Sequence, residues 1–567
     1  MSDSGFRVAR LIPMSHDQIG PGVTHEMSDS RPTVSPVLIL ISTAFVVVLP
    51  AILYGYPTGH DSFLHATAWF DTLTHWKEGN FFPAWSSRFA FGWGQPIAIF
   101  YPPLSFNFGA LCLLLFGPYF APIVFVWTIL SAAGYSAYRF AKLLISEKYA
   151  VFAGVTYILS PYLGLNVYER NAFGELMAAS IFPLVLYTYV RVQRDRKSPL
   201  FMAFALCLML LTNIPAMAIT AGIVTILTIV DAWQSRSLSP PLRSAIAGAL
   251  ALSLSAFYLL PVIAQKDIVK LRLVATGGQA PVNNFELLTK QPLFKHDFFS
   301  YLALISAILT LLLIVIIVAT WKSNSLPMRR PLYAVAAFSL LLMLPFTASL
   351  YSLPGMKYIN FPWRFLFVVS FLIGLFLAYA LSQSKNSWWI AALTACAFAG
   401  AWFAMWPPTF LHDPYATWGK YSDMRTAALP GVQELMPISA HYDEDGNYGP
   451  AQPVSVESGA PCRTLQAITW QSEHRIVRFD CPPDTTLVIK TFFYPGWRIL
   501  ANGHPAPVAF NEKGAFLVKV QGVGTLEMNF AVTQDRIAGK FVSLITLLLC
   551  ALYVVVQRRR SPTLLAT

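Results

Sequence analysis

The sequence predicts a polytopic α-helical membrane protein of about twelve transmembrane helices, with a β-sandwich domain near the C-terminus. Of its 567 residues 55% are hydrophobic and only 12% are charged, and the mean hydropathy is +0.53. A single soluble core could not bury that much apolar surface. Many apolar runs approach the roughly 20 residues that a helix needs to cross a bilayer. The net charge of +12 then reflects basic cytoplasmic loops rather than a nucleic-acid surface.

A polar segment comes first, and the transmembrane domain is predicted over residues 37–407. Residues 1–36 contain no short apolar stretch before a small-residue cleavage site, so we expect a disordered cytoplasmic tail rather than a signal peptide. Residues 538–567 are predicted to form a last transmembrane helix with a basic cytoplasmic tail. The predicted crossings lie near residues 37–55, 119–138, 150–166, 175–192, 199–212, 216–232, 243–262, 299–320, 331–351, 363–382, 387–407 and 538–556.

The distribution of Arg and Lys sets the orientation of these crossings. Basic clusters fall in every second loop, and those loops are cytoplasmic by the positive-inside rule. We interpret the apolar run at 103–117 as a juxtamembrane or re-entrant helix at the outer surface, because a full crossing there would put several clusters outside. An even number of crossings places both termini inside. Four longer segments then face outward, at residues 56–118, 166–175, 263–298 and 408–537.

The largest outer segment, 408–537, is predicted to be an extracytoplasmic domain. Alternating apolar and polar residues, separated by turn signals, indicate a small antiparallel β-sandwich over about 455–535. Cys462 and Cys481 both lie in this polar segment, and a disulfide between them is expected if the segment faces an oxidising compartment. The predicted strands lie at 464–470, 474–480, 485–493, 515–521 and 524–532.

Asp61 is the leading candidate for chemistry, since it follows the first crossing directly within Tyr56-Pro-Thr-Gly-His-Asp-Ser-Phe-Leu-His65. Residues 61–78 have the pattern of an amphipathic helix on the membrane surface. Capping of that helix and catalysis remain two alternatives for Asp61. The spacing of His60, His65 and His75 does not favour a zinc site. A divalent cation shared by Asp61 and a lipid phosphate stays open.

Two further charged groups lie at the outer ends of crossings. In Tyr168-Glu-Arg-Asn-Ala-Phe-Gly-Glu175, Arg170 either pairs with Glu169 or Glu175 to fix a turn, or binds a phosphate. In Phe361-Pro-Trp-Arg364, Arg364 either extends to the membrane surface or adds positive charge to the same cavity.

These motifs also carry a family resemblance. Gly59-His-Asp-Ser-Phe-Leu-His65, Phe91-Gly-Trp-Gly, Phe100-Tyr-Pro-Pro and the segments around Arg170 and Arg364 resemble the bacterial and archaeal membrane proteins labelled "6-pyruvoyl-tetrahydropterin synthase-related". The segment Phe493-Tyr-Pro-Gly-Trp-Arg-Ile-Leu-Ala-Asn-Gly503 resembles the C-terminal domain of YfhO-like proteins. Both groups are similar to GT-C superfamily glycosyltransferases, which use polyprenyl-phosphate sugars. The resemblance covers nearly the whole chain after residue 37.

The resemblance implies an inverting glycosyl transfer at the outer face of a bacterial or archaeal cytoplasmic membrane. Asp61 matches the catalytic carboxylate of the first external loop and is expected to act as general base. Many GT-C members have a second acidic residue beside it, whereas this chain has His60 and Ser62, which favours a single base. The implied phosphate-binding residues are Arg170, Arg364 and His65, with His60, Glu169 and Glu175 in support.

The expected partners are a polyprenyl-phosphate-linked sugar donor, an acceptor glycan, lipid or protein, and membrane lipids, with no nucleic acid. No metal site and no firm cofactor are expected. Two other classes of function remain as alternatives. One is a transporter or flippase of lipid-linked sugars, although the predicted crossings carry few ionisable residues. The other is a non-catalytic assembly factor that presents the β-sandwich.

Overall fold

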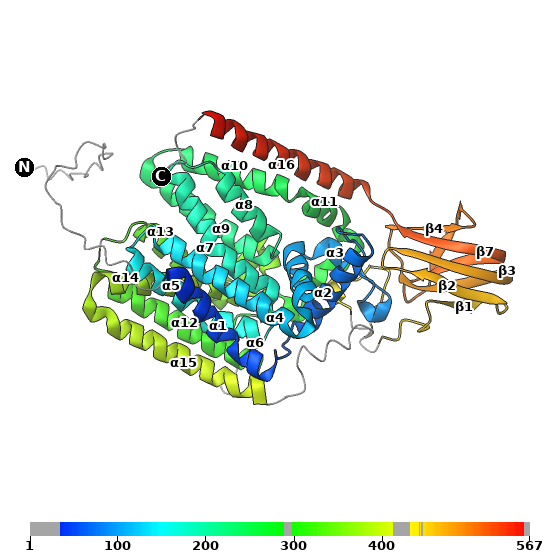
Figure 1. Ribbon diagram of the computed structural model, residues 1–567, viewed down its shortest axis with the longest axis horizontal. Coiled ribbons are helices and arrows are strands. Elements are labelled where there is room, and N and C mark those ends of the chain that lie inside the picture. Colours follow the sequence, from blue (N-terminus) through cyan, green and yellow to red (C-terminus); the bar gives the residue numbers. More distant parts are fainter. Residues whose placement is uncertain are drawn as a thin grey trace, which may run out of the picture.

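A helical bundle forms most of the molecule, and an antiparallel sheet stands at one end of it (Figure 1). The computed structural model describes residues 35–287, 297–323, 325–411, 431–441, 443 and 446–560. Residues 1–34 of the predicted N-terminal tail and residues 561–567 of the predicted C-terminal tail lie outside the described residues. The helices are α1 (Pro36–Tyr54), α2 (Ser62–Lys77), α3 (Ile97–Phe100), α4 (Pro103–Ala141), α5 (Glu147–Ile158), α6 (Pro161–Tyr168), α7 (Phe173–Gln193), α8 (Leu200–Leu210), α9 (Ile214–Ser235), α10 (Ser239–Leu254), α11 (Ala256–Gln265), α12 (Phe298–Thr320), α13 (Arg329–Leu342), α14 (Leu366–Gln383), α15 (Trp388–Leu411) and α16 (Gln534–Arg560).

The chain is a multi-pass membrane protein. Within the described ranges, nine helices are long and apolar enough to cross a membrane, and the number reaches eleven if two bent helix pairs each count as one span. The sequence predicted twelve crossings. The difference includes the segment predicted at 199–212, because α8 has only 11 residues and would span roughly 17 Å at 1.5 Å per residue.

The long helix α4 contains the run that was expected to lie at the outer surface. Its 39 residues would measure roughly 58 Å if straight, about twice the thickness of the hydrocarbon core. The helix is broken at Gly117, whose φ of 70° lies in the left-handed region that favours glycine. Residues 103–117 therefore form a separate first arm of α4, which packs against α2.

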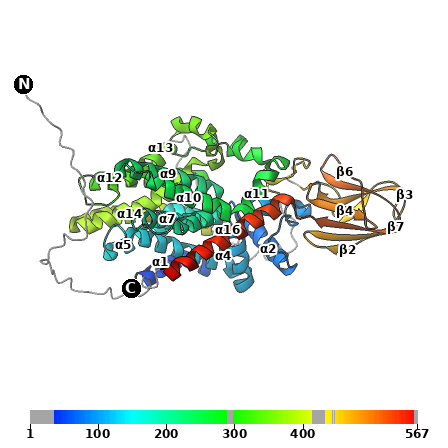
Figure 2. The ribbon, with the colours of Figure 1, turned by 90° about the horizontal axis from the view of Figure 1, so that it is seen from above.

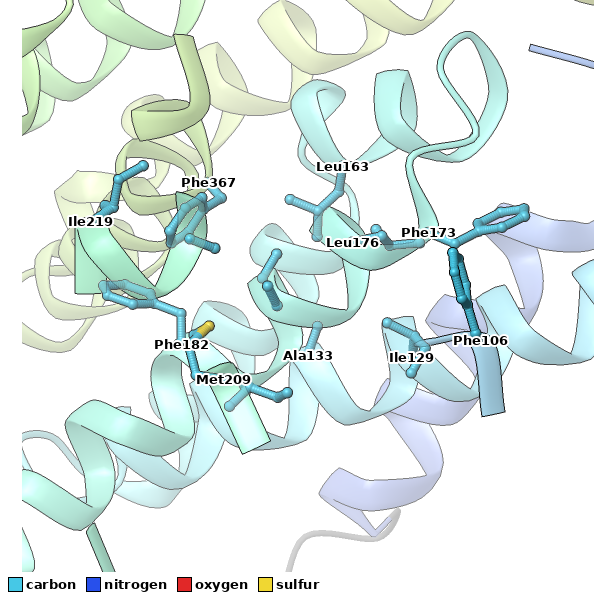
Figure 3. Close-up of a cluster of buried hydrophobic side chains, with 14 of the residues drawn as sticks. Phe106, Ile129, Ala133, Leu163, Phe173, Leu176, Phe182, Met209, Ile219 and Phe367 are labelled. Atoms are coloured by element: carbon cyan, nitrogen blue, oxygen red, sulfur yellow. The ribbon is translucent and has the colours of Figure 1, made fainter. Parts of the chain in front are cut away.

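The interior of the bundle is built around α14, which is buried at nearly every residue. It packs against α5 and α12, while α4 packs against α5 and α7. Figure 3 shows aromatic and aliphatic side chains from these helices interlocking, among them Phe173 and Phe182 of α7 and Phe367 of α14. Because Phe173 is the first residue of α7 and is fully buried, this core fixes the position of the turn that precedes α7.

The last helix, α16, runs along the outside of the bundle from the sheet toward the opposite end (Figures 1 and 2). It packs mainly against α11 and α10, and most of its apolar side chains are exposed, as expected for a helix surrounded by lipid.

Within the described residues the sheet has seven strands, and all of their pairings are antiparallel, with β3 and β7 as the longest strands. The sequence predicted two strands in place of each. The Pro-Pro-Asp break after Cys481 is instead a bulge within β3, since β7 pairs with β3 on both sides of it. Cys462 and Cys481 are joined by a disulfide. The strands are β1 (Val454–Ser458), β2 (Thr464–Trp470), β3 (His474–Phe492), β4 (Trp497–Ala501), β5 (His504–Pro505), β6 (Val508–Phe510) and β7 (Ala515–Phe530).

The sheet packs against the loop that follows α2. The Glu473 carboxylate accepts hydrogen bonds from the backbone N–H groups of Ala84 and Trp85, the latter at 2.9 Å. The buried Trp85 ring contacts the rings of Trp497 and Phe530, both in or beside the sheet core. The first and the last of the predicted outer segments are therefore in direct contact.

The remaining predicted outer segments lie at the same end. Lys270 donates its backbone N–H to Met436 at 3.0 Å, and Tyr494 donates its hydroxyl to Gln265 at 2.6 Å. His60 pairs with Glu169 through the backbone, as described below. All four segments that the charge pattern placed on one side thus meet at one end of the bundle.

Candidate functional site

Asp61 is held in place by the turn between α6 and α7. Its backbone N–H donates to the Arg170 carbonyl at 2.7 Å, and the His60 N–H donates to the Glu169 carbonyl at 3.0 Å. Gly59 makes this approach possible, because a Cβ at that position would lie 2.5 Å from the Glu169 carbonyl oxygen. The carboxylate and the arginine therefore belong to one rigid unit, although more than 100 residues separate them in the chain.

The side chain of Asp61 occupies the N-cap position of α2 but does not cap the helix. It accepts no hydrogen bond from the first turn. Instead, one oxygen lies 2.7 Å from His60 Nδ1 and the other lies 3.7 Å from Arg170 Nη2. The side chain is 25% exposed, so a ligand in the surrounding space can reach it.

Electrostatics keep Asp61 ionised. Burial acts to raise its pKa, but the hydrogen bond with His60 and the Arg170 guanidinium outweigh burial and lower the pKa from 3.8 to about 2. The same hydrogen bond raises the pKa of His60 above its ordinary value of 6.5. His60 is largely exposed, whereas Asp61 faces the buried arginine.

Glu175 joins the two arginines that the sequence singled out separately. Its Oε2 lies 3.0 Å from Arg170 Nη1 and 3.0 Å from Arg364 Nε, and all three side chains are largely buried. The Tyr162 hydroxyl donates to the other carboxylate oxygen. Asn166 accepts a second hydrogen bond from Arg170 at 2.8 Å. Arg170 is therefore oriented by three groups, two carboxylates and an amide.

Arg364 reaches this cluster from the turn before α14. Its guanidinium donates to the Ile359 carbonyl at 3.0 Å and to the Asn360 side chain, and it lies 4.7 Å from the centroid of the Phe361 ring. Asn360 has a φ of 37°, a positive value that asparagine tolerates better than most residues. These contacts direct Arg364 inward toward Glu175 rather than outward to the membrane surface.

His65 lies in an aromatic pocket one turn into α2. Its ring contacts Tyr101, Phe106 and Phe173, and it is 1% exposed. Burial lowers the pKa of His65 to about 4, so the ring is neutral near neutral pH and offers no positive charge to a phosphate. A phosphate-binding role for His65 would therefore rest on a neutral N–H donor.

Sequence reasoning did not predict the contacts of Ser62, Asn171 and Tyr162 in this arrangement. Ser62 hydrogen-bonds through its hydroxyl to Asn171 Oδ1 at 2.8 Å and so closes the contact between the two loops. Tyr162 is one of two tyrosines in the otherwise mostly apolar helix α6, and no sequence signal distinguishes it from a core tyrosine. In the described part of the chain, no group of three or more His, Cys, Asp or Glu side chains is arranged to hold a metal ion.

Comparison with protein-family models and with curated proteins gives no match. Two solved structures are similar in part. One is the arabinofuranosyltransferase AftD from Mycobacteria, with 15% identity and a TM-score of 0.41 over 67% of this chain and 27% of AftD. The other is ArnT from Cupriavidus metallidurans, solved with undecaprenyl phosphate, with 15% identity and a TM-score of 0.43 over 68% of each chain. This chain thus spans about a quarter of AftD.

Proposed function

We propose that this protein is a glycosyltransferase that moves a sugar from a polyprenyl-phosphate donor to a glycan, lipid or protein acceptor. The reaction takes place at the outer face of a bacterial or archaeal cytoplasmic membrane and inverts the anomeric centre. Asp61 acts as the general base, and Arg170 and Arg364 stabilise the leaving phosphate. Glu175 holds the two arginines in position.

The observation that carries the proposal is the placement of Asp61. An ionised carboxylate at a helix start normally accepts hydrogen bonds from the helix N–H groups. Asp61 accepts none of these and faces a buried arginine instead, while part of its surface stays accessible. A carboxylate left out of the helix cap and backed by a fixed cation is suited to receive a proton from a bound hydroxyl group.

The charges of the cluster match the charges that the reaction creates. Asp61 and Glu175 carry two negative charges, and Arg170 and Arg364 carry two positive ones, so these four side chains sum to zero. When the acceptor hydroxyl gives its proton to Asp61, the sum becomes +1. At the same time the acceptor oxygen bonds to the anomeric carbon, and the bond from that carbon to the phosphate oxygen breaks. The positive charge thus appears as the phosphate gains negative charge.

His60 is proposed to tune this base. Its hydrogen bond lowers the pKa of Asp61 in the free protein and so weakens Asp61 as a base. Because the His60 ring is exposed, an acceptor hydroxyl can take its place beside Asp61. Displacement of the ring would raise the basicity of Asp61 only when an acceptor is bound.

The test is sugar transfer by the purified protein from a panel of polyprenyl-phosphate sugars. We expect Asp61→Asn to lower the transfer rate by about 100-fold to 10,000-fold, the usual contribution of a general base. Asp267→Asn is the matched control, since Asp267 is exposed at the same end of the molecule. Full activity of Asp61→Asn would refute the assignment of the base. Lipid-linked sugar translocation without transfer, in the wild-type protein, would support a transporter instead.

A further inference from the structure

A second feature at the same end of the molecule is a mostly apolar cavity bordered by α2, α3, α4, α11 and α16. Its volume is about 330 Å³, within the range of small-molecule sites. Its walls are almost entirely apolar and aromatic, including Ile99, Leu104, Phe257 and Pro261. None of the residues proposed for catalysis lines it.

Two basic residues stand at this cavity, both from the outer end of α16. Arg536 and Lys540 are one helical turn apart and therefore share a face of the helix. Arg536 is 7% exposed and donates to the Phe82 carbonyl at 2.5 Å, and the Lys540 amino group lies 4.9 Å from the centroid of the Phe82 ring. Within the described residues neither one makes an ion pair with a carboxylate.

The cost of placing charge at an apolar surface without a ligand falls on the buried Arg536, because Lys540 is exposed and lies within electrostatic range of the Glu473 carboxylate. A buried cation normally has a counterion, as Arg170 and Arg364 have in Glu175. Asp535, the nearest acidic residue in sequence, accepts from the Gln265 side chain at 2.6 Å instead. An anionic group on an apolar chain would satisfy both the cations and the walls.

We propose that this cavity binds a lipid that carries a phosphate headgroup, with the phosphate at Arg536 and Lys540 and the hydrocarbon chain along α4 and α11. Among the candidate spans of the described residues, α16 has the smallest buried share, 11%, so the helix that carries both cations would face lipid. The guanidinium supplies a planar pair of donors and the ammonium a point charge, a combination suited to a phosphate monoester or diester.

The cavity is separate from the Asp61 cluster, and Tyr101 lies between them. The Tyr101 ring lines the cavity and stacks on Phe106 at 4.4 Å between centroids. The Tyr101 hydroxyl points the other way, toward Gly174. A Cβ added at Gly174 would lie 3.5 Å from this hydroxyl oxygen. Gly174 directly precedes Glu175. The lipid site therefore stands whether or not the proposed transfer reaction is correct.

The experiment is photo-crosslinking of the full-length protein in nanodiscs with a polyprenyl phosphate that carries a diazirine in its chain. We expect crosslinks in peptides from α3, α11 and the outer end of α16. Joint replacement of the cations, Arg536→Gln with Lys540→Gln, should lower this labelling by about tenfold or more, because two charge-assisted contacts are lost. Arg498→Gln with Lys519→Gln is the matched control, since both residues are exposed on the sheet.

Two further variants separate the possible outcomes. Ala98→Trp fills the cavity and leaves the cations, so it should also reduce labelling. Asp61→Asn should leave labelling unchanged, even if it abolishes transfer. The proposal is overturned if the double variant is labelled like the wild type, or if an uncharged polyprenol probe labels the same peptides equally well. It is also overturned if inorganic phosphate competes as well as the unlabelled lipid phosphate, which would indicate a site for free phosphate.

Discussion

Replacement of Glu175 by glutamine tests whether the Glu175 charge stabilises the two buried arginines, Arg170 and Arg364. The substitution keeps the shape of the side chain and removes its charge. In the wild type, Arg170 and Arg364 each lie 3.0 Å from the Glu175 carboxylate. The variant leaves both arginines buried with one fewer counterion. Breaking a buried pair in this way costs about 3–5 kcal/mol. We expect the melting temperature in detergent to fall by on the order of 5 °C or more.

The assay is thermal unfolding followed by tryptophan fluorescence, with Glu512→Gln as the control because Glu512 is exposed. The double variant Glu175→Gln with Arg364→Gln removes one charge of each sign. It should recover part of the lost stability, since one buried arginine no longer lacks a partner. A Glu175→Gln protein as stable as the control would refute the reasoning. So would a double variant with no recovery, which would point to lost packing instead of unpaired charge.

Three other outcomes are expected. Gly59→Ala should lower transfer activity by at least about tenfold, because the added Cβ would lie 2.5 Å from the Glu169 carbonyl oxygen and displace Asp61. A wild-type rate in the transfer assay would contradict this prediction. Burial acts to lower the pKa of His75, but the Asp71 carboxylate outweighs it and raises the pKa to about 9. Protonated His75 therefore contributes stability that is complete below pH 6.5 and is lost as the pH rises through about 9. Proteolysis of the loop after α2 should accelerate between about pH 7 and about pH 10 in the wild type. The same rise in pH should not accelerate proteolysis of His75→Phe. Cys462 should resist alkylation until a reductant is added, and ready labelling in the native protein would exclude the disulfide.

The membrane class and the grouping of the outer segments were predictable because both follow from composition. Apolar runs mark helices, and alternating basic loops mark sides, without any knowledge of packing. The count of crossings was harder to predict. The 11 residues of α8 and the bend between α10 and α11 depend on how neighbouring helices pack, and the hydropathy of the sequence does not record that.

The candidate site could be predicted only in part, for a related reason. Its charged residues stand out in an apolar chain, so Asp61, Arg170, Glu175 and Arg364 were all identified. How Glu175 connects the two arginines was not predicted. The sequence offered an Arg170–Glu175 pair and a shared cavity with Arg364 as alternatives, but it did not predict that one carboxylate, Glu175, binds both arginines, 189 residues from Arg364. A pairing over that distance is set by the fold of α6, α7 and α14.

The short connection between the sheet and the last helix has a mechanical consequence. Strand β7 ends at Phe530 and α16 begins at Gln534, and Gln265 anchors the start of α16 through Asp535. The sheet cannot turn on the bundle without pulling on the first turn of α16, which carries Arg536. A partner that binds the sheet would thereby shift Arg536 and change the affinity for the lipid proposed to bind there, without contacting that lipid.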